Sequence, residues 1–137
     1  MKLEHVGIAV ADIEETIQIF ENLFGARPYK SEEVNSEGVR THFYEAGGTK
    51  IELLESTRED SPIARYIERH GPGLHHLAFA ADDAADALSR IRDSGYRVLS
   101  EEPRPGADGK LIFFVHPKDA GGVLVEFCSD AAASVRD

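Results

Sequence analysis

The stretch GLHHLAFA at residues 73–80 decides the fold, because the chain carries a near-copy of it, LEHVGIAV, at residues 3–10. Both copies follow the pattern Leu, any residue, His, apolar, small, apolar, Ala. A short apolar run with alternating small residues predicts a β-strand. Each copy leads into a helical pattern that begins at an aspartate, Asp12 or Asp83, a residue type favoured at helix N-caps. We interpret the two copies as the first strands of an internal repeat.

The first copy is followed by one helix and further strands. Apolar residues recur at helical spacing between Asp12 and Gly25, and glycine is a common stop just after a helix. Residues 38–45 and 49–54 predict two strands joined by a glycine turn. A short helix at residues 63–70, opened by a Ser-Pro pair, predicts a connector to the second copy.

The second copy repeats this order. Its predicted elements are a helix from Asp83 to about Ser94, a short strand at Tyr96–Ser100, a turn-rich loop at residues 103–109, strands at Leu111–His116 and Gly122–Cys128, and a tail from Ser129 onward that we expect to fray.

The sequence therefore predicts an α+β fold in which two tandem βαβββ modules form a curled mixed sheet around a metal site. We expect one domain over residues 1–137. The first module covers about residues 2–56, the helical connector residues 57–72, and the second module about residues 73–129.

Composition excludes several classes of function. The 137-residue chain has a net charge of −10, which disfavours nucleic-acid binding, and no apolar run long enough for a membrane span. Its single cysteine, Cys128, excludes an internal disulfide. Because a strand pattern begins at Lys2, we expect no signal or transit peptide and a cytoplasmic protein.

One histidine and one glutamate recur at matching places in the two halves: His5 and Glu52 in the first, His76 and Glu126 in the second. A single strand histidine or glutamate is usually a hydrogen-bonded or surface residue. Four such residues at equivalent positions favour a metal site instead. Two imidazoles and two carboxylates suit Zn²⁺, Co²⁺, Mn²⁺ or Ni²⁺.

Several other polar residues receive a different interpretation. Strand alternation places His75 on the face opposite His76, which predicts a packing or supporting role. We expect His116 to cap a turn and Cys128 to be passive. The cations of residues 104–110 and Lys118 either belong to an exposed loop or contact a charged substrate.

The doubled unit with its His/Glu pairs resembles the vicinal oxygen chelate superfamily, which includes glyoxalase I, extradiol dioxygenases and methylmalonyl-CoA epimerases. The resemblance is strongest to the epimerases and covers residues 2–128. The matching segments are TKIELLE at 49–55, DSPIA at 60–64, GLHHLA at 73–78, SEEP at 100–103, HPK at 116–118 and GGVLVE at 121–126.

This resemblance implies metal ligation by His5, His76 and Glu126, with Glu52 at a fourth position. It also implies one divalent ion per site, with Co²⁺ as first candidate, and a homodimer that acts on a small CoA thioester. One position departs from the pattern. Some epimerases carry a glutamate, proposed as catalytic base, where this chain has Thr41.

The predicted reaction interconverts (R)- and (S)-methylmalonyl-CoA through α-proton abstraction and a metal-stabilised enolate. Glu126 is the first candidate for the base and Glu52 the second, although a carboxylate held as a ligand is a poor free base. The alternatives are a glyoxalase I-like enzyme or a non-catalytic small-molecule-binding module of the same fold. Four donors argue against an Fe(II) dioxygenase, whose sites use two histidines and one carboxylate.

Overall fold

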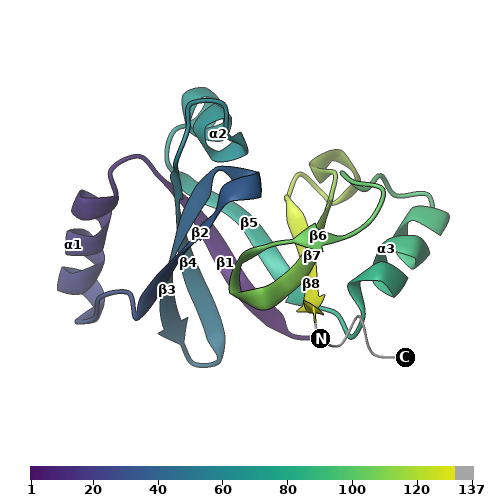
Figure 1. Cartoon of the computed structure of the whole chain (residues 1–137), viewed down its shortest axis with the longest axis horizontal. Coiled ribbons are helices and arrows are strands. Elements are labelled where there is room, and N and C mark those ends of the chain that lie inside the picture. The colour runs from purple at the N-terminus through teal and green to yellow at the C-terminus, as the bar shows by residue number, and fades with distance from the viewer. Residues whose placement is uncertain (132–137) are drawn as a thin grey trace. The chain divides into compact units, whose positions relative to one another are not determined.

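A computed structural model describes residues 1–131 (Figure 1). The first half contains β1 (Leu3–Val10), α1 (Ile13–Phe24), β2 (Lys30–Val34), β3 (Val39–Ala46), β4 (Thr49–Ser56) and α2 (Pro62–His70). The second half contains β5 (Gly73–Ala80), α3 (Ala84–Asp93), β6 (Arg104–Pro105), β7 (Lys110–Val115) and β8 (Val125–Asp130). Each half is thus a βαβββ unit, which confirms the predicted α+β repeat.

The strands form a mixed sheet in the order β2-β3-β4-β1-β5-β8-β7-β6. The pairs β2–β3, β3–β4, β6–β7 and β7–β8 are antiparallel, and β5–β8 is parallel. The chain divides into two compact units, residues 6–75 and residues 1–5 with those from 76 onward. β1 and β5 each contribute residues to both units. No helix among the described residues is long and apolar enough to cross a membrane.

In the unit of residues 6–75, helices cover both faces of the strands. Asp12 caps α1 by accepting a hydrogen bond from the backbone N–H of Glu15, and Gly25 ends the helix in the left-handed conformation. Ile17 of α1 packs with Val10 on one face. Alternation sends the next apolar set, which includes Ala9 and Leu54, to the other face, where Ile63 of α2 covers it.

In the other unit, α3 lies against β7 and β8 (Figure 1). Ala84, Ala87 and Leu88 of α3 pack on Phe113 and Val115 of β7. The opposite face of these strands holds a second apolar cluster, formed by Ala78, Ile112 and Cys128 with Phe114 beside it. His76 and Glu126 alternate onto this second face, so the strand period directs their side chains away from α3.

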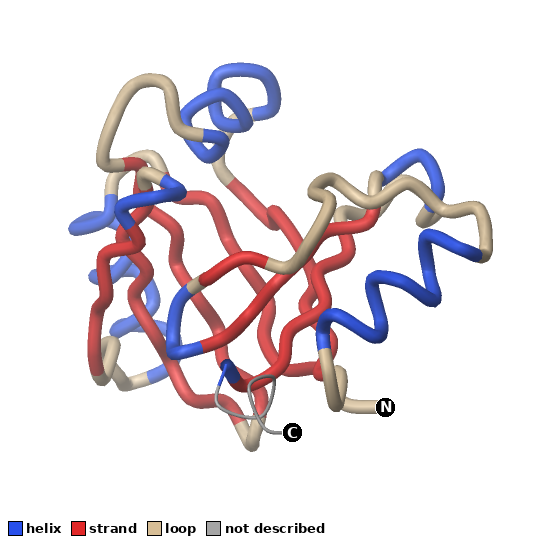
Figure 2. The backbone as a smooth tube through the Cα atoms, turned by 45° about the vertical axis from the view of Figure 1, so that its right-hand side comes forward, coloured by secondary structure: helices blue, strands red, loops and turns tan. Residues whose placement is uncertain are grey.

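The prediction of a strand at Tyr96–Ser100 is wrong. This segment makes a single bridge, Val98 to Val115, and otherwise runs as a loop (Figure 2). The Ser100 hydroxyl donates to the carbonyl of Glu102 at 2.8 Å, which bends the chain away from β7. The edge strand of the sheet is β6, which lies inside the predicted loop, and its Arg104 pairs with Ile112 of β7.

The last strand is also displaced from its predicted bounds. It begins at Val125 because Gly121 and Gly122 have φ angles of 69° and 87°, which suit a turn and not an extended strand. It continues through Ser129, whose hydroxyl accepts from the N–H of Ala84 at 3.0 Å and is buried. The predicted fraying at Ser129 is therefore wrong, and the tail beyond residue 131 lies outside the described residues.

Candidate metal centre

Three of the four predicted ligands meet on strands of one compact unit: His5 on β1, His76 on β5 and Glu126 on β8. The two Nε2 atoms are 3.0 Å apart. Glu126 Oε1 lies 3.2 Å from His76 Nε2, and Oε2 lies 3.4 Å from His5 Nε2. Sheet register explains how Glu126 reaches this place, since it pairs with Ala78 of β5 and Phe114 of β7.

The cluster is almost fully closed to solvent, with relative exposures of 5% for His5, 7% for His76 and 3% for Glu126. Burial disfavours the charged form of Glu126, but the ring nitrogens of the two histidines favour it more strongly and lower its pKa to about 2. Glu126 is therefore a carboxylate at neutral pH, held between two imidazoles.

A divalent cation fits these residues. Each contributes a donor atom, and the donor atoms lie within 4.8 Å of one another. Glu126 Oε2 is buried and accepts no hydrogen bond, which is costly unless another positive group satisfies it. Two imidazole nitrogens and one carboxylate oxygen form a donor set used for Zn²⁺, Co²⁺, Mn²⁺ and Ni²⁺.

Comparison with known proteins identifies the family. Residues 4–114 match the model of the Glyoxalase/Bleomycin resistance protein/Dioxygenase superfamily. The chain belongs to this superfamily. Within the superfamily, it is 40% identical to the mitochondrial methylmalonyl-CoA epimerase of Homo sapiens, over 91% of this chain and 72% of that protein.

Two further members of the superfamily have similar names. The ethylmalonyl-CoA/methylmalonyl-CoA epimerase of Cereibacter sphaeroides is 41% identical, over 91% of this chain and 95% of that protein. A variant of the Streptomyces coelicolor methylmalonyl-CoA epimerase, solved with 2-nitronate-propionyl-CoA, superposes with a TM-score of 0.88 at 36% identity, covering 96% of this chain and 98% of that one. The predicted resemblance to epimerases of the glyoxalase superfamily is confirmed.

Glu52, the fourth predicted ligand, lies on β4 in the compact unit of residues 6–75. It is buried, with 4% exposure, and pairs in register with Phe43 of β3. Lys50, on the same strand face, is also buried, and its ammonium lies over the Phe43 ring. The place of Glu52 among the ligands stays a prediction.

Thr41 of β3, where some epimerases carry a proposed base, is buried with 1% exposure. Its register partner on β2 is Glu32, so a carboxylate is present on the neighbouring strand.

Glu4 is a site residue that the sequence reasoning missed. Its Oε1 lies 2.5 Å from His5 Nδ1, and both side chains are buried. Alternation alone assigns neighbouring residues to opposite faces of a strand, so Glu4 gave no signal as a partner of His5. The one sequence feature that could have indicated this contact is the acidic residue directly before a candidate histidine ligand.

The remaining polar residues largely follow their predicted roles. The ring of His75 meets the Tyr66 ring edge-on at 4.8 Å, and His75 belongs to neither group of possible metal donors among the described residues. His116 caps the turn after β7, since its Nδ1 accepts from the N–H of Lys118 at 3.1 Å. Cys128 is buried, and its thiol donates to the carbonyl of Phe79.

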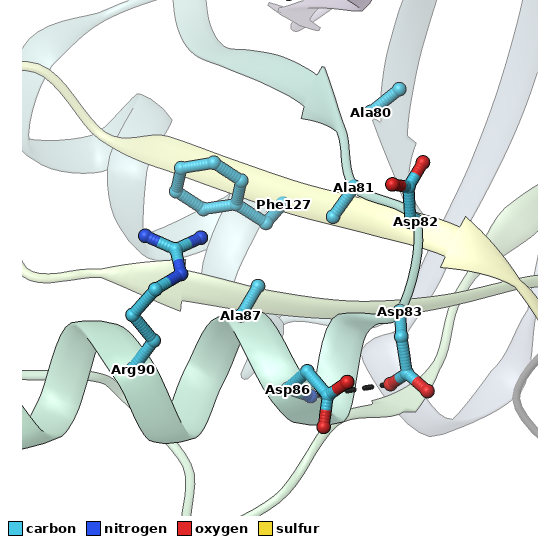
Figure 3. A pocket seen from close by; sticks show the side chains of 8 residues that line it. All are labelled: Ala80, Ala81, Asp82, Asp83, Asp86, Ala87, Arg90 and Phe127. Atoms are coloured by element: carbon cyan, nitrogen blue, oxygen red, sulfur yellow. Dashed lines mark hydrogen bonds between the residues drawn. The ribbon is translucent and has the colours of Figure 1, made fainter.

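A pocket of about 300 Å³ lies at the start of α3, and its lining residues do not include His5, His76 or Glu126 (Figure 3). Its walls include Asp82, Asp83 and Asp86, with Arg90 one turn further along. Asp83 accepts from the N–H of Asp86 at 3.2 Å, as an N-cap does. Three carboxylates against one guanidinium give this pocket a negative balance, which disfavours an anionic ligand.

Proposed function

We propose that this protein is a metal-dependent epimerase that interconverts (R)- and (S)-methylmalonyl-CoA by removing and returning the α-proton. The observation that carries this proposal is the buried cluster of His5, His76 and Glu126, in a chain whose relatives include several named methylmalonyl-CoA epimerases. Co²⁺ is the first candidate ion, with Mn²⁺, Ni²⁺ and Zn²⁺ as alternatives.

His5, His76 and Glu126 would hold the ion, and Glu52 is the proposed fourth ligand or base. When bound, a divalent cation supplies Lewis-acid chemistry and a local positive charge for the carboxylate and thioester oxygens of a substrate. That charge matters here because the protein carries a net charge of −10 and the substrate is an anion. The imidazoles orient the centre, and burial keeps competing water out.

Between the two candidate bases, the geometry favours Glu126 as a ligand. Both of its oxygens face imidazole nitrogens, at 3.2 and 3.4 Å, so neither is free to approach a substrate C–H bond. We therefore propose Glu52 as the group that takes the α-proton. Epimerisation also needs a second group that returns a proton to the opposite face.

A glyoxalase I-like activity is the main alternative. A putative lactoylglutathione lyase of Brassica oleracea is 25% identical to this chain, which spans 42% of that protein. The epimerases are far more similar, so the epimerase proposal stands first. A non-catalytic binding module has no need of a buried ligand set, and the retained His5–His76–Glu126 cluster argues against it.

We further propose a cytoplasmic homodimer. The resemblance to the epimerases suggested the dimer, and α1 carries apolar side chains that an interface could cover. Ile19, Leu23 and Phe24 are exposed by 45%, 68% and 61%. Sedimentation equilibrium of the wild type and of a Leu23→Glu variant would test whether this face mediates association.

Deuterium exchange tests the proposed reaction. The metal-free protein is loaded separately with Co²⁺, Mn²⁺, Ni²⁺ or Zn²⁺ and incubated with methylmalonyl-CoA in deuterated water. At least one ion should give α-deuterium incorporation that EDTA abolishes, while the glutathione hemithioacetal of methylglyoxal should not react. Exchange with none of the four ions would refute the epimerase proposal, and turnover of the hemithioacetal would favour the glyoxalase alternative.

Two isosteric variants separate the carboxylates. Glu52→Gln should retain metal binding and lose α-proton exchange. Glu126→Gln should instead weaken metal binding, and proton exchange should fall as a consequence. If Glu52→Gln exchanges the α-proton at the wild-type rate, Glu52 is not the base.

A further inference from the structure

Glu4 contacts the ring nitrogen of His5 that faces away from the other two clustered residues. Glu4 Oε1 lies 2.5 Å from His5 Nδ1, on the far side of the ring from Nε2. The two residues are exposed by only 7% and 5%. A buried carboxylate is costly unless it is paired, so this contact is part of the packed interior and not a chance surface encounter.

The contact has a direct consequence for the protonation pattern of the ring. A carboxylate accepts hydrogen bonds, so Nδ1 of His5 carries the proton that it donates to Glu4. In the neutral imidazole, the lone pair is then on Nε2. That nitrogen is the one that lies 3.0 Å from His76 Nε2 and 3.4 Å from Glu126 Oε2.

We propose that Glu4 is a positioning residue of the metal centre, which fixes the tautomer and the orientation of His5 so that Nε2 presents its lone pair to the ion. Outer carboxylate partners of this kind raise the basicity of a histidine ligand and hold its ring in place. The inference rests on the proposed metal centre but not on the identity of the substrate.

The second repeat carries a different residue at the position that corresponds to Glu4. The residue before His76 is His75, and its ring meets Tyr66 edge-on at 4.8 Å. The His76 ring meets Phe114 edge-on at 5.6 Å. The two histidines are equivalent in the repeat, yet only the first is preceded by a carboxylate.

Cys128 offers a competing explanation for Glu4. Donor atoms of Glu4, His5 and Cys128 also lie within 4.8 Å of one another, so this trio could hold a thiophilic ion through Nδ1. Two contacts favour the supporting role instead. Nδ1 is at hydrogen-bond distance from Glu4, and the Cys128 thiol is directed to the carbonyl of Phe79 at 3.7 Å.

Metal affinity measured without substrate tests the proposal. Glu4→Leu removes the acceptor, Glu4→Gln keeps the shape without the charge, and Glu101→Gln makes the same change at an exposed site of the same compact unit. Titration with Co²⁺ should show affinity about 10- to 100-fold weaker for Glu4→Leu, an intermediate loss for Glu4→Gln and no change for Glu101→Gln. Circular dichroism of the metal-free variants controls for folding.

Nitrogen-15 spectra of the Zn²⁺-loaded protein give a second readout. In the wild type, the His5 ring should show a protonated Nδ1 and a metal-bound Nε2, and the Nδ1 proton should exchange with water faster in Glu4→Gln. If Glu4→Leu does not fold, Glu4→Gln and these spectra decide the question.

Three results would overturn the proposal. One is a folded Glu4 variant whose Co²⁺ affinity stays within twofold of the wild type. Another is a thiolate-to-Co²⁺ charge-transfer band that Cys128→Ser removes. Such a band would show that Cys128 binds the ion, and Glu4 would then belong to the alternative ligand set of Glu4, His5 and Cys128. Failure of the wild type to bind any ion would remove the metal centre as well. Metal binding without α-proton exchange would refute only the epimerase proposal and leave the role of Glu4 intact.

Discussion

Replacing His76 by alanine should destabilise the metal-free protein as well as remove a ligand. Glu126 is 3% exposed, its Oε2 accepts no hydrogen bond, and its Oε1 lies 3.2 Å from His76 Nε2. Without the imidazole, a buried carboxylate loses a polar partner, which costs about 1–3 kcal/mol. Loss of the edge-on contact with Phe114 adds about 0.5–1 kcal/mol. We expect a total near 3 kcal/mol, equivalent to roughly 10 °C in Tm for a domain of this size.

His76→Gln is the matched variant, because its amide can still donate to Glu126 but cannot replace an imidazole as ligand. Urea unfolding in EDTA should therefore rank the wild type first, His76→Gln second and His76→Ala last. Adding Co²⁺ to 100 times its Kd should stabilise the wild type by about 2.7 kcal/mol and either variant far less. The reasoning fails if metal-free His76→Ala unfolds within about 0.5 kcal/mol of the wild type, well below the cost of an unpaired buried group. It also fails if His76→Ala keeps the full stabilisation by Co²⁺.

Three further changes test the packing and charge pairs around the fold. Ser61→Ala should cost about 1 kcal/mol in urea unfolding, because the fully buried hydroxyl caps α2 by accepting from the N–H of Ala64 at 3.0 Å. Leu88→Ala should cost about 2–5 kcal/mol in the same assay, since Leu88 is 1% exposed in the core beneath α3. Hydrogen bonds from Arg97 hold the pKa of Asp119 well below its usual range. The contribution of this pair to folding stability is therefore complete at pH values above the pKa of Asp119 in the unfolded chain, and it is lost as the pH falls toward the folded-state pKa. In Arg97→Ala, the carbon-13 titration midpoint of Asp119 should rise but stay below roughly 4, because the backbone N–H of residue 97 still donates to the carboxylate. An unchanged midpoint would contradict this.

The sequence was sufficient to predict three residues that the structure brings together, because strand geometry has a period of two. Alternation assigned His76 and not its neighbour His75 to the cluster face, and the structure confirms that choice. The repeat then predicted His5, Glu52 and Glu126 as partners of His76, and the structure places His5 and Glu126 with it in one group of possible donors. Periodicity could find these residues because each points where an ideal strand directs it.

Features that depend on local hydrogen bonds were not predictable in the same way. The segment Tyr96–Ser100 has strand-like composition, yet the hydroxyl of Ser100 bonds the chain into a bend and β6 takes its place at the edge. The contact of Glu4 with His5 was not predictable for a related reason. Its carboxylate contacts the ring of the next residue, a contact that a two-residue period assigns to opposite faces.

Packing contacts and hydrogen bonds specify different properties of a histidine ring. The edge-on contacts of His76 with His5 and Phe114, at 5.1 and 5.6 Å, restrain the plane of its ring but act almost equally on both neutral tautomers. A carboxylate on Nδ1 restrains the plane and also selects the tautomer. His5 is thus prepared for a metal ion before the ion arrives. A change at Glu4 should therefore affect metal affinity more than an equally conservative change at Phe114, such as Phe114→Leu, which loosens the His76 ring without altering where its proton resides.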